Sequence, residues 1–165
     1  MGWTGTWIVF VHVAAAFLFV MGHGASMWAS DQIRRERDVE RGRVLLEMSA
    51  RSLGLVYGAL VTLLIAGIAA GIIGGHFGRG WIWLSIGVLV TTAVLMYALA
   101  TTYYRGVREA VGIRAPQTAR GAPDPVAVSA DELAAIVDSR RPDVIGLVGI
   151  VGLLVLLWLM MFKPF

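Results

Sequence analysis

The sequence contains no cysteine, and that absence removes several kinds of chemistry from a chain of 165 residues. Disulfides, thiolate metal sites and cysteine nucleophiles are excluded. Charge is scarce as well: 15% of the residues are charged, whereas a soluble domain carries about 25%. Hydrophobic residues make up 58% of the chain. This composition is typical of a membrane protein.

Lysine is almost missing, and Lys163 is the one example. The net charge of +3 therefore comes almost wholly from arginine. Acidic residues lie between the arginines, which argues against a continuous basic surface for nucleic acid. We expect no nucleic-acid partner, and we interpret the arginine clusters as signals of membrane topology.

Carboxylates are absent from four long apolar runs, at residues 7–29, 53–73, 81–99 and 144–162. Each run is close to the roughly 20 residues that an α-helix needs to cross a bilayer. Strands of a membrane barrel would alternate in polarity, and these runs do not. No positive charge precedes the first run, as it would in a cleaved signal peptide, so we expect this run to stay as a helix.

The arginines predict the orientation of these spans. Cytoplasmic loops of membrane proteins carry an excess of Arg and Lys. Of the three loops, the middle one holds only Arg79, and the other two hold all the remaining arginines: Arg34, Arg35, Arg37, Arg41, Arg43 and Arg51 in the first, and Arg105, Arg108, Arg114, Arg120, Arg140 and Arg141 in the third. The first and third loops are therefore predicted to be cytoplasmic, with both termini outside.

Two details of this topology can be checked against a structure. Trp81 is expected in the outer aromatic belt and Tyr103 in the inner one, because amphipathic rings favour membrane interfaces. The first cytoplasmic loop lacks proline and is dense in alternating charge. We expect the first two spans to continue as helices beyond the membrane and to meet in a tight turn near Gly42.

The other cytoplasmic segment, residues 113–141, is different in kind. Its first half contains three prolines and predicts an extended linker. Ser129 and Glu132 then match the capping box of a helix start. Leu133, Ile136 and Val137 form one apolar stripe. We expect a short amphipathic helix that lies on the inner membrane face or docks on the bundle, where it could bind a partner.

Small residues predict how the spans pack, because lipid offers no hydrophobic drive for helix association. The second span carries two small-xxx-small patterns, Gly54 with Gly58 and Gly67 with Gly71. The fourth span also carries spaced glycines. We therefore expect an all-α fold, an integral membrane antiparallel four-helix bundle that forms a single domain. A homo-oligomer or a subunit of a membrane complex would fit the same patterns.

The first span contains two histidines, His12 and His23. Eleven residues bring a helix round to nearly the same face, about 16 Å further along. The stripe that they share is small or polar and includes Ala15, Ala16, Phe19, Gly22, Ser26 and Ser30, whereas Phe10, Phe17, Leu18, Val20, Met21 and Trp28 lie opposite. The stripe should face the bundle, and an ionisable residue inside a membrane is a functional candidate.

Two layers of candidate ligands follow from this arrangement. An outer layer would combine His12 with His76 of the middle loop. An inner layer would combine His23 with Met27 or Met96. Three interpretations remain open: a structural hydrogen bond that fixes helix register, axial ligation of haem b, and a copper site of His and Met ligands. A proton relay is a fourth, although no span holds an acid.

Motifs for catalysis are missing. The sequence shows no nucleophile beside a base and no glycine-rich loop placed to hold phosphate. We therefore expect a binding or accessory membrane protein rather than an enzyme, with a b-type haem protein for electron transfer as one form and a cofactor-free subunit as the other.

The motifs F-V-H-V-A-A-A-F-L-F-V-M-G-H-G, R-R-E-R-D and L-L-E-M-S-A-R-S resemble those of a group of small four-span bacterial membrane proteins, of an actinobacterial or Chloroflexi type. That group is similar to the copper resistance D-type proteins and to the membrane protoporphyrinogen oxidases. The resemblance implies the cytoplasmic membrane and makes His12 the family histidine. It also implies copper movement or haem binding, the latter with a basic intramembrane residue, and residues 81–99 contain no Lys or Arg.

Overall fold

The computed structural model describes residues 2–116 and 119–165, and within them it contains helices and no strands. The long helices are α1 (Trp3–Arg35), α2 (Val39–Ile73), α3 (Gly80–Ala110) and α5 (Arg141–Phe162). A single 3-10 turn, η1 (His76–Gly78), joins α2 to α3, and a short helix, α4 (Ala130–Val137), precedes α5. Gln117 and Thr118 of the predicted linker lie outside the described residues.

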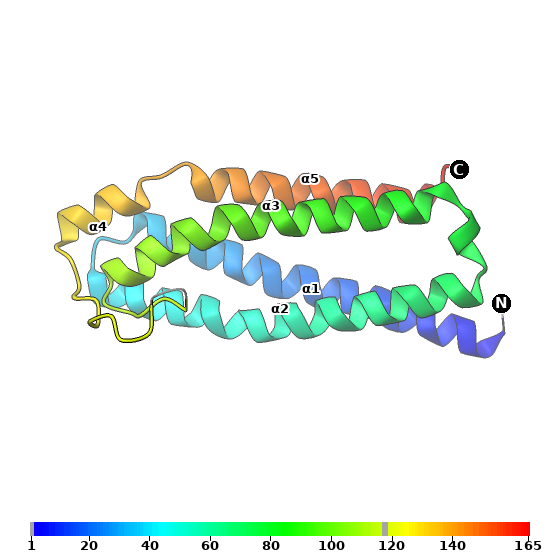
Figure 1. The fold of residues 1–165 in the computed structure, drawn as a ribbon, viewed down its shortest axis with the longest axis horizontal. Coiled ribbons are helices and arrows are strands. Elements are labelled where there is room, and N and C mark those ends of the chain that lie inside the picture. The colour runs from blue at the N-terminus through cyan, green and yellow to red at the C-terminus, as the bar shows by residue number, and fades with distance from the viewer. Residues whose placement is uncertain (1, 117–118) are drawn as a thin grey trace.

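The four long helices run side by side as two pairs (Figure 1). α1 packs along α2, and α3 packs along α5, while contacts between the two pairs are sparse. Both chain termini lie at one end of the molecule, together with η1. α4 and the turn between α1 and α2 lie at the opposite end, which we call the charged end because the arginine clusters gather there.

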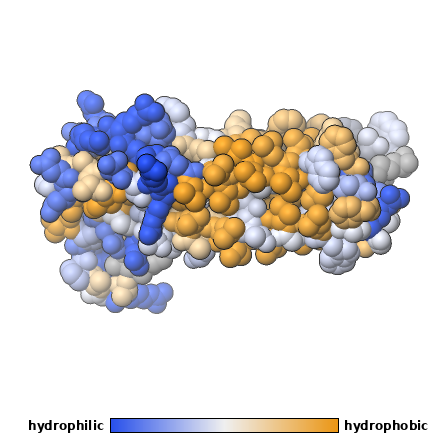
Figure 2. All heavy atoms as spheres, turned by 90° about the horizontal axis from the view of Figure 1, so that it is seen from above, coloured by the Kyte–Doolittle hydropathy of each residue, from blue (hydrophilic) through white to orange (hydrophobic). Residues whose placement is uncertain are grey.

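The surface of the long helices is apolar along the middle of the molecule, and Figure 2 shows this band beside the hydrophilic charged end. Most of the apolar side chains in the four helices face outward rather than into a core. A surface of this extent is unfavourable in water. All four helices are long and apolar enough to cross a membrane, with α4 and α5 counted as one apolar stretch.

The larger of two hydrophobic cores lies at the charged end, where α4 docks on the bundle. Leu133 and Val137 of α4 pack with Val107 and Val111 near the end of α3 and with Leu46 of α2. The predicted capping box is confirmed, since the Ser129 hydroxyl accepts a bond from the Glu132 amide and the Glu132 carboxylate accepts from the Ser129 amide. The prediction for Ile136 was wrong: this side chain is exposed, on the outer face of α4.

The turn between α1 and α2 lies earlier than predicted. α1 ends at Arg35 and α2 begins at Val39, so Gly42 is helical. The physical cause is Asp38, whose carboxylate accepts a hydrogen bond from the Arg41 amide and starts α2. Gly42 serves packing instead, because a Cβ there would meet Val111 and Leu133 of the charged-end core.

The second core lies at the opposite end and contains Trp81, Ile82 and Leu159. Trp81 is only 3% exposed, so its predicted place in an aromatic belt was wrong. The ring is covered by Leu159 of α5 and by the Lys163 ammonium, 5.7 Å from the ring centroid. Tyr103 was misplaced for the same reason, since it is 5% exposed and belongs to the charged-end core.

Candidate functional site

The stripe predicted on α1 is confirmed by burial. Ala15, Gly22 and Ser30 are buried, and the large apolar residues predicted on the opposite face, such as Phe17 and Met21, are exposed. The two histidines of the stripe nevertheless meet different helices, because the two helix pairs touch different sides of it.

His12 lies against α2. Its Nδ1 is 2.9 Å from the backbone carbonyl oxygen of Leu63. A carbonyl can only accept, so Nδ1 carries the proton and donates it. The other ring nitrogen, Nε2, is then an unprotonated lone pair. This tautomer suits a ligand of a metal, and it equally suits a purely structural bond between helices.

Gly67 makes this hydrogen bond possible. It lies one helical turn after Leu63, and a Cβ at Gly67 would be 2.9 Å from both Nδ1 and Cε1 of His12. The missing side chain lets the imidazole reach a carbonyl that already belongs to the α2 ladder. The small-xxx-small pattern of Gly67 and Gly71 therefore serves close packing: Gly71 is buried against Phe77 and Ile82.

His23 faces the other helix pair. Its ring stacks on Phe19 with centroids 5.7 Å apart and planes 5° from parallel. Its Nε2 and the Sδ of Met96, on α3, approach the same point on α5: a Cβ built at Gly149 would be 3.5 Å from the nitrogen and 3.4 Å from the sulfur. An imidazole nitrogen and a thioether sulfur from two helices thus converge on a glycine of a third.

Met27 lies one turn after His23 on α1 and contacts the same face of α5. Its Cε would be 3.2 Å from a Cβ at Gly146, one turn before Gly149. The three side chains predicted for the inner layer are therefore gathered along Gly146 and Gly149. We call His23, Met27 and Met96 the inner cluster, and their role as ligands stays a prediction.

The outer layer is less compact. His76 belongs to η1, and its ring lies 5.5 Å from that of Trp81 and against Gly74. Its partners are therefore residues around the start of α3, whereas His12 contacts the middle of α2. Joint ligation by His12 and His76 stays a prediction. The described residues contain no group of three or more His, Asp or Glu side chains able to hold a metal.

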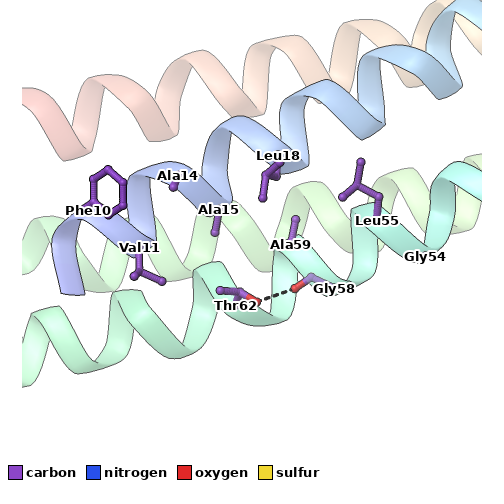
Figure 3. A pocket seen from close by; sticks show the side chains of 10 residues that line it. All are labelled: Phe10, Val11, Ala14, Ala15, Leu18, Gly54, Leu55, Gly58, Ala59 and Thr62. Carbon is purple, nitrogen blue, oxygen red and sulfur yellow. Dashed lines mark hydrogen bonds between the residues drawn. The ribbon is translucent and has the colours of Figure 1, made fainter. Parts of the chain in front are cut away.

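Two shallow grooves lie on the surface of the α1–α2 pair, and Figure 3 shows one of them. Its walls are apolar, and its one polar side chain, Thr62, already donates to the Gly58 carbonyl. Gly54 and Gly58 are open here, with no atom near their missing Cβ positions. Neither groove is lined by a histidine, so neither is a candidate for the ligand chemistry considered above.

Sequence reasoning missed the polar groups between the inner cluster and the charged end. The Arg34 guanidinium pairs with Asp143 at 2.5 Å and links α1 to α5. The hydroxyls of Ser30 and Tyr103 are buried without a hydrogen-bond partner in the described part of the chain. Ser30 could have been found, because it continues the histidine stripe, and Tyr103 could have been found seven residues after Met96.

Comparison with known proteins adds no family. No family model matches the chain, and no curated protein or solved structure is detectably similar to it.

Proposed function

We propose that this protein is a multi-pass protein of the bacterial cytoplasmic membrane that binds haem b in its bundle and passes electrons within the membrane. In this proposal the helices form an antiparallel four-span bundle with both termini outside. His23 supplies an imidazole ligand to the haem iron, and Met96 supplies the ligand on the opposite side. The resemblance of the first span to haem-binding and copper-handling families agrees with this assignment.

The membrane part of the proposal rests on surface chemistry. The four candidate spans expose their apolar side chains, and this arrangement is favourable only if lipid replaces water around them. The arginines gather at the end that carries α4, and the opposite loop has only Arg79. The positive-inside rule then directs the charged end to the cytoplasm.

The convergence of His23 and Met96 carries the cofactor part. Histidine paired with methionine is an established axial ligand set for haem iron. The two groups come from α1 and α3, on opposite helix pairs, so a flat cofactor between the pairs could reach both. Bundle cores are common sites for such cofactors.

The distribution of the core agrees with a cofactor in the middle. Both hydrophobic cores lie at the ends of the molecule, and the two helix pairs touch only sparsely between them. The side chains around the inner cluster, such as those of Phe19 and Met27, are only partly buried. A haem placed there would supply apolar contact that the protein alone does not make.

Copper is the second candidate, and Met27 is the observation that favours it. One imidazole and two thioethers form a soft ligand set, which suits Cu(I). Under this alternative the protein holds a single copper ion along the face of Gly146 and Gly149. The site needs no space for a porphyrin.

Pigment and metal analysis of three variants tests the proposal. We expect purified protein to contain haem, and His23→Ala and Met96→Leu to lose it or alter its spectrum. Met21→Leu is the matched control, because Met21 lies on the lipid face of α1 and should leave the spectrum unchanged. Copper without haem, lost in Met27→Leu, would favour the second candidate. A colourless, metal-free protein after expression with added haem would overturn both.

A further inference from the structure

A set of buried hydrogen-bond donors lies next to the inner cluster, on the side of the charged end. Ser30 is 6% exposed and Tyr103 is 5% exposed, and neither hydroxyl has a partner in the described ranges. Buried polar groups in native proteins are nearly always paired. Two such hydroxyls in one region therefore indicate a missing polar partner.

The spacing connects these hydroxyls to the inner cluster. Ser30 follows His23 by seven residues on α1, and Tyr103 follows Met96 by seven residues on α3. Seven residues are two helical turns, about 10 Å, and return to nearly the same face. α1 and α3 both run toward the charged end. Each hydroxyl therefore lies two turns beyond its ligand candidate, in the same direction.

Arg34 adds positive charge to this region, one turn after Ser30. Its guanidinium has five N–H donors, and one hydrogen bond to Asp143 is present. Tyr103 lies within electrostatic reach of both Arg34 and Asp143. The region therefore combines two unpaired hydroxyls with a partly used arginine, and Asp143 alone supplies the opposing charge.

We infer that Ser30, Tyr103 and Arg34 bind the propionate carboxylates of the haem. This inference rests on the proposed function. Haem b carries two carboxylates along one edge, at a distance from the iron comparable to two helical turns. Carboxylates are acceptors only, so they complement hydroxyl and guanidinium donors. They would also direct that edge of the haem toward the cytoplasm.

The test compares haem b with its dimethyl ester, which lacks both carboxylates. Cofactor-free protein in detergent is titrated with each, and binding is followed by the Soret absorbance. Wild type should bind haem b about tenfold or more tightly than the ester, since hydrogen bonds to charged groups are the stronger kind. Tyr103→Phe and Ser30→Ala should weaken haem b binding and leave ester binding unchanged.

Tyr97→Phe is the matched control, because Tyr97 is exposed on the same helix and should change neither affinity. Cofactor-free Tyr103→Phe should melt no lower than wild type, since its hydroxyl has no partner to lose. Equal affinity of wild type for haem b and the ester, with binding still dependent on His23, would overturn the inference and leave the proposed function standing. No Soret band with either compound would overturn both.

Discussion

At the scale of single residues, the contact between His12 and Gly67 gives the sharpest prediction. Gly67→Ala places a methyl group 2.9 Å from the imidazole and must displace it from the Leu63 carbonyl. We expect a loss of about 1–3 kcal/mol in the free energy of unfolding, from the lost bond and the strain. Thermal unfolding in detergent measures it.

Gly58→Ala is the control for that substitution on the same helix. Nothing lies within 4 Å of the Cβ it adds, and alanine favours helix by about 1 kcal/mol. Its stability should be equal or higher. A Gly67→Ala protein as stable as Gly58→Ala would contradict the described His12 contact.

The sequence predicted which residues of α1 face inward but not which neighbour each one meets. Burial follows a period of 3.6 residues, so the stripe of His12 and His23 could be recognised from spacing alone. Whether a histidine contacts α2 or α5 depends on how four helices cross. The positions of Gly67 and Gly149, which make room for the two imidazoles, become meaningful only when the helices are placed side by side.

At the scale of elements, the docking of α4 depends on two side chains. Leu133→Ala removes a side chain that is 2% exposed in the charged-end core. We expect docked α4 to lose about 3 kcal/mol, as for other buried leucines. Proteinase K should then cleave residues 130–137 faster. Ile136→Ala, on the exposed face, should be cleaved at the wild-type rate, and equal cleavage of both variants would argue against docking.

The capping box of α4 predicts a dependence on pH. Hydrogen bonds from the Ser129 amide and hydroxyl hold the pKa of Glu132 below its ordinary value. A lowered pKa means that the ionised carboxylate stabilises the folded helix above the ordinary carboxyl pKa, and that this contribution disappears as pH falls through the lowered value.

Amide hydrogen exchange at a series of pH values measures that effect. Protection of the first turn of α4 should fall on acidification in the wild-type protein. Ser129→Ala should already exchange about fivefold faster at neutral pH and should respond less to acid. Protection that is constant with pH in the wild type would show that the capping box does not stabilise α4.

Helix ends were predicted well where a side chain marks them and poorly elsewhere. Ser129 and Glu132 form a specific motif, so the start of α4 was found within one residue. The turn between α1 and α2 was placed at Gly42, because glycine often ends a helix. Asp38 was not recognised as the cap, since the surrounding residues are charged throughout and offer no single signal.

At the scale of the whole molecule, the absence of native cysteine permits a direct test of orientation. Gly78→Cys places a thiol in η1, and Arg120→Cys places one in the exposed linker. We expect a membrane-impermeant maleimide to label Gly78→Cys in intact cells and Arg120→Cys only after permeabilisation. The reverse pattern would contradict the proposed orientation.

The four apolar helices could be predicted from composition and length, but their grouping into two loosely joined pairs could not. Hydropathy reports what each helix exposes to lipid, and lipid-facing leucines look alike wherever they lie. The sparse contact between the pairs, with cores confined to the two ends, appears only in three dimensions. This arrangement, rather than any sequence motif, brings His23 and Met96 together.

The most direct test of the central claim is the visible spectrum of the purified protein, recorded in air and again after dithionite. Axial imidazole and thioether ligation of haem b predicts a Soret band that shifts on reduction, with sharp α and β bands. The bands should be lost in His23→Ala. A protein without these bands, purified from cells supplied with haem, would contradict the account.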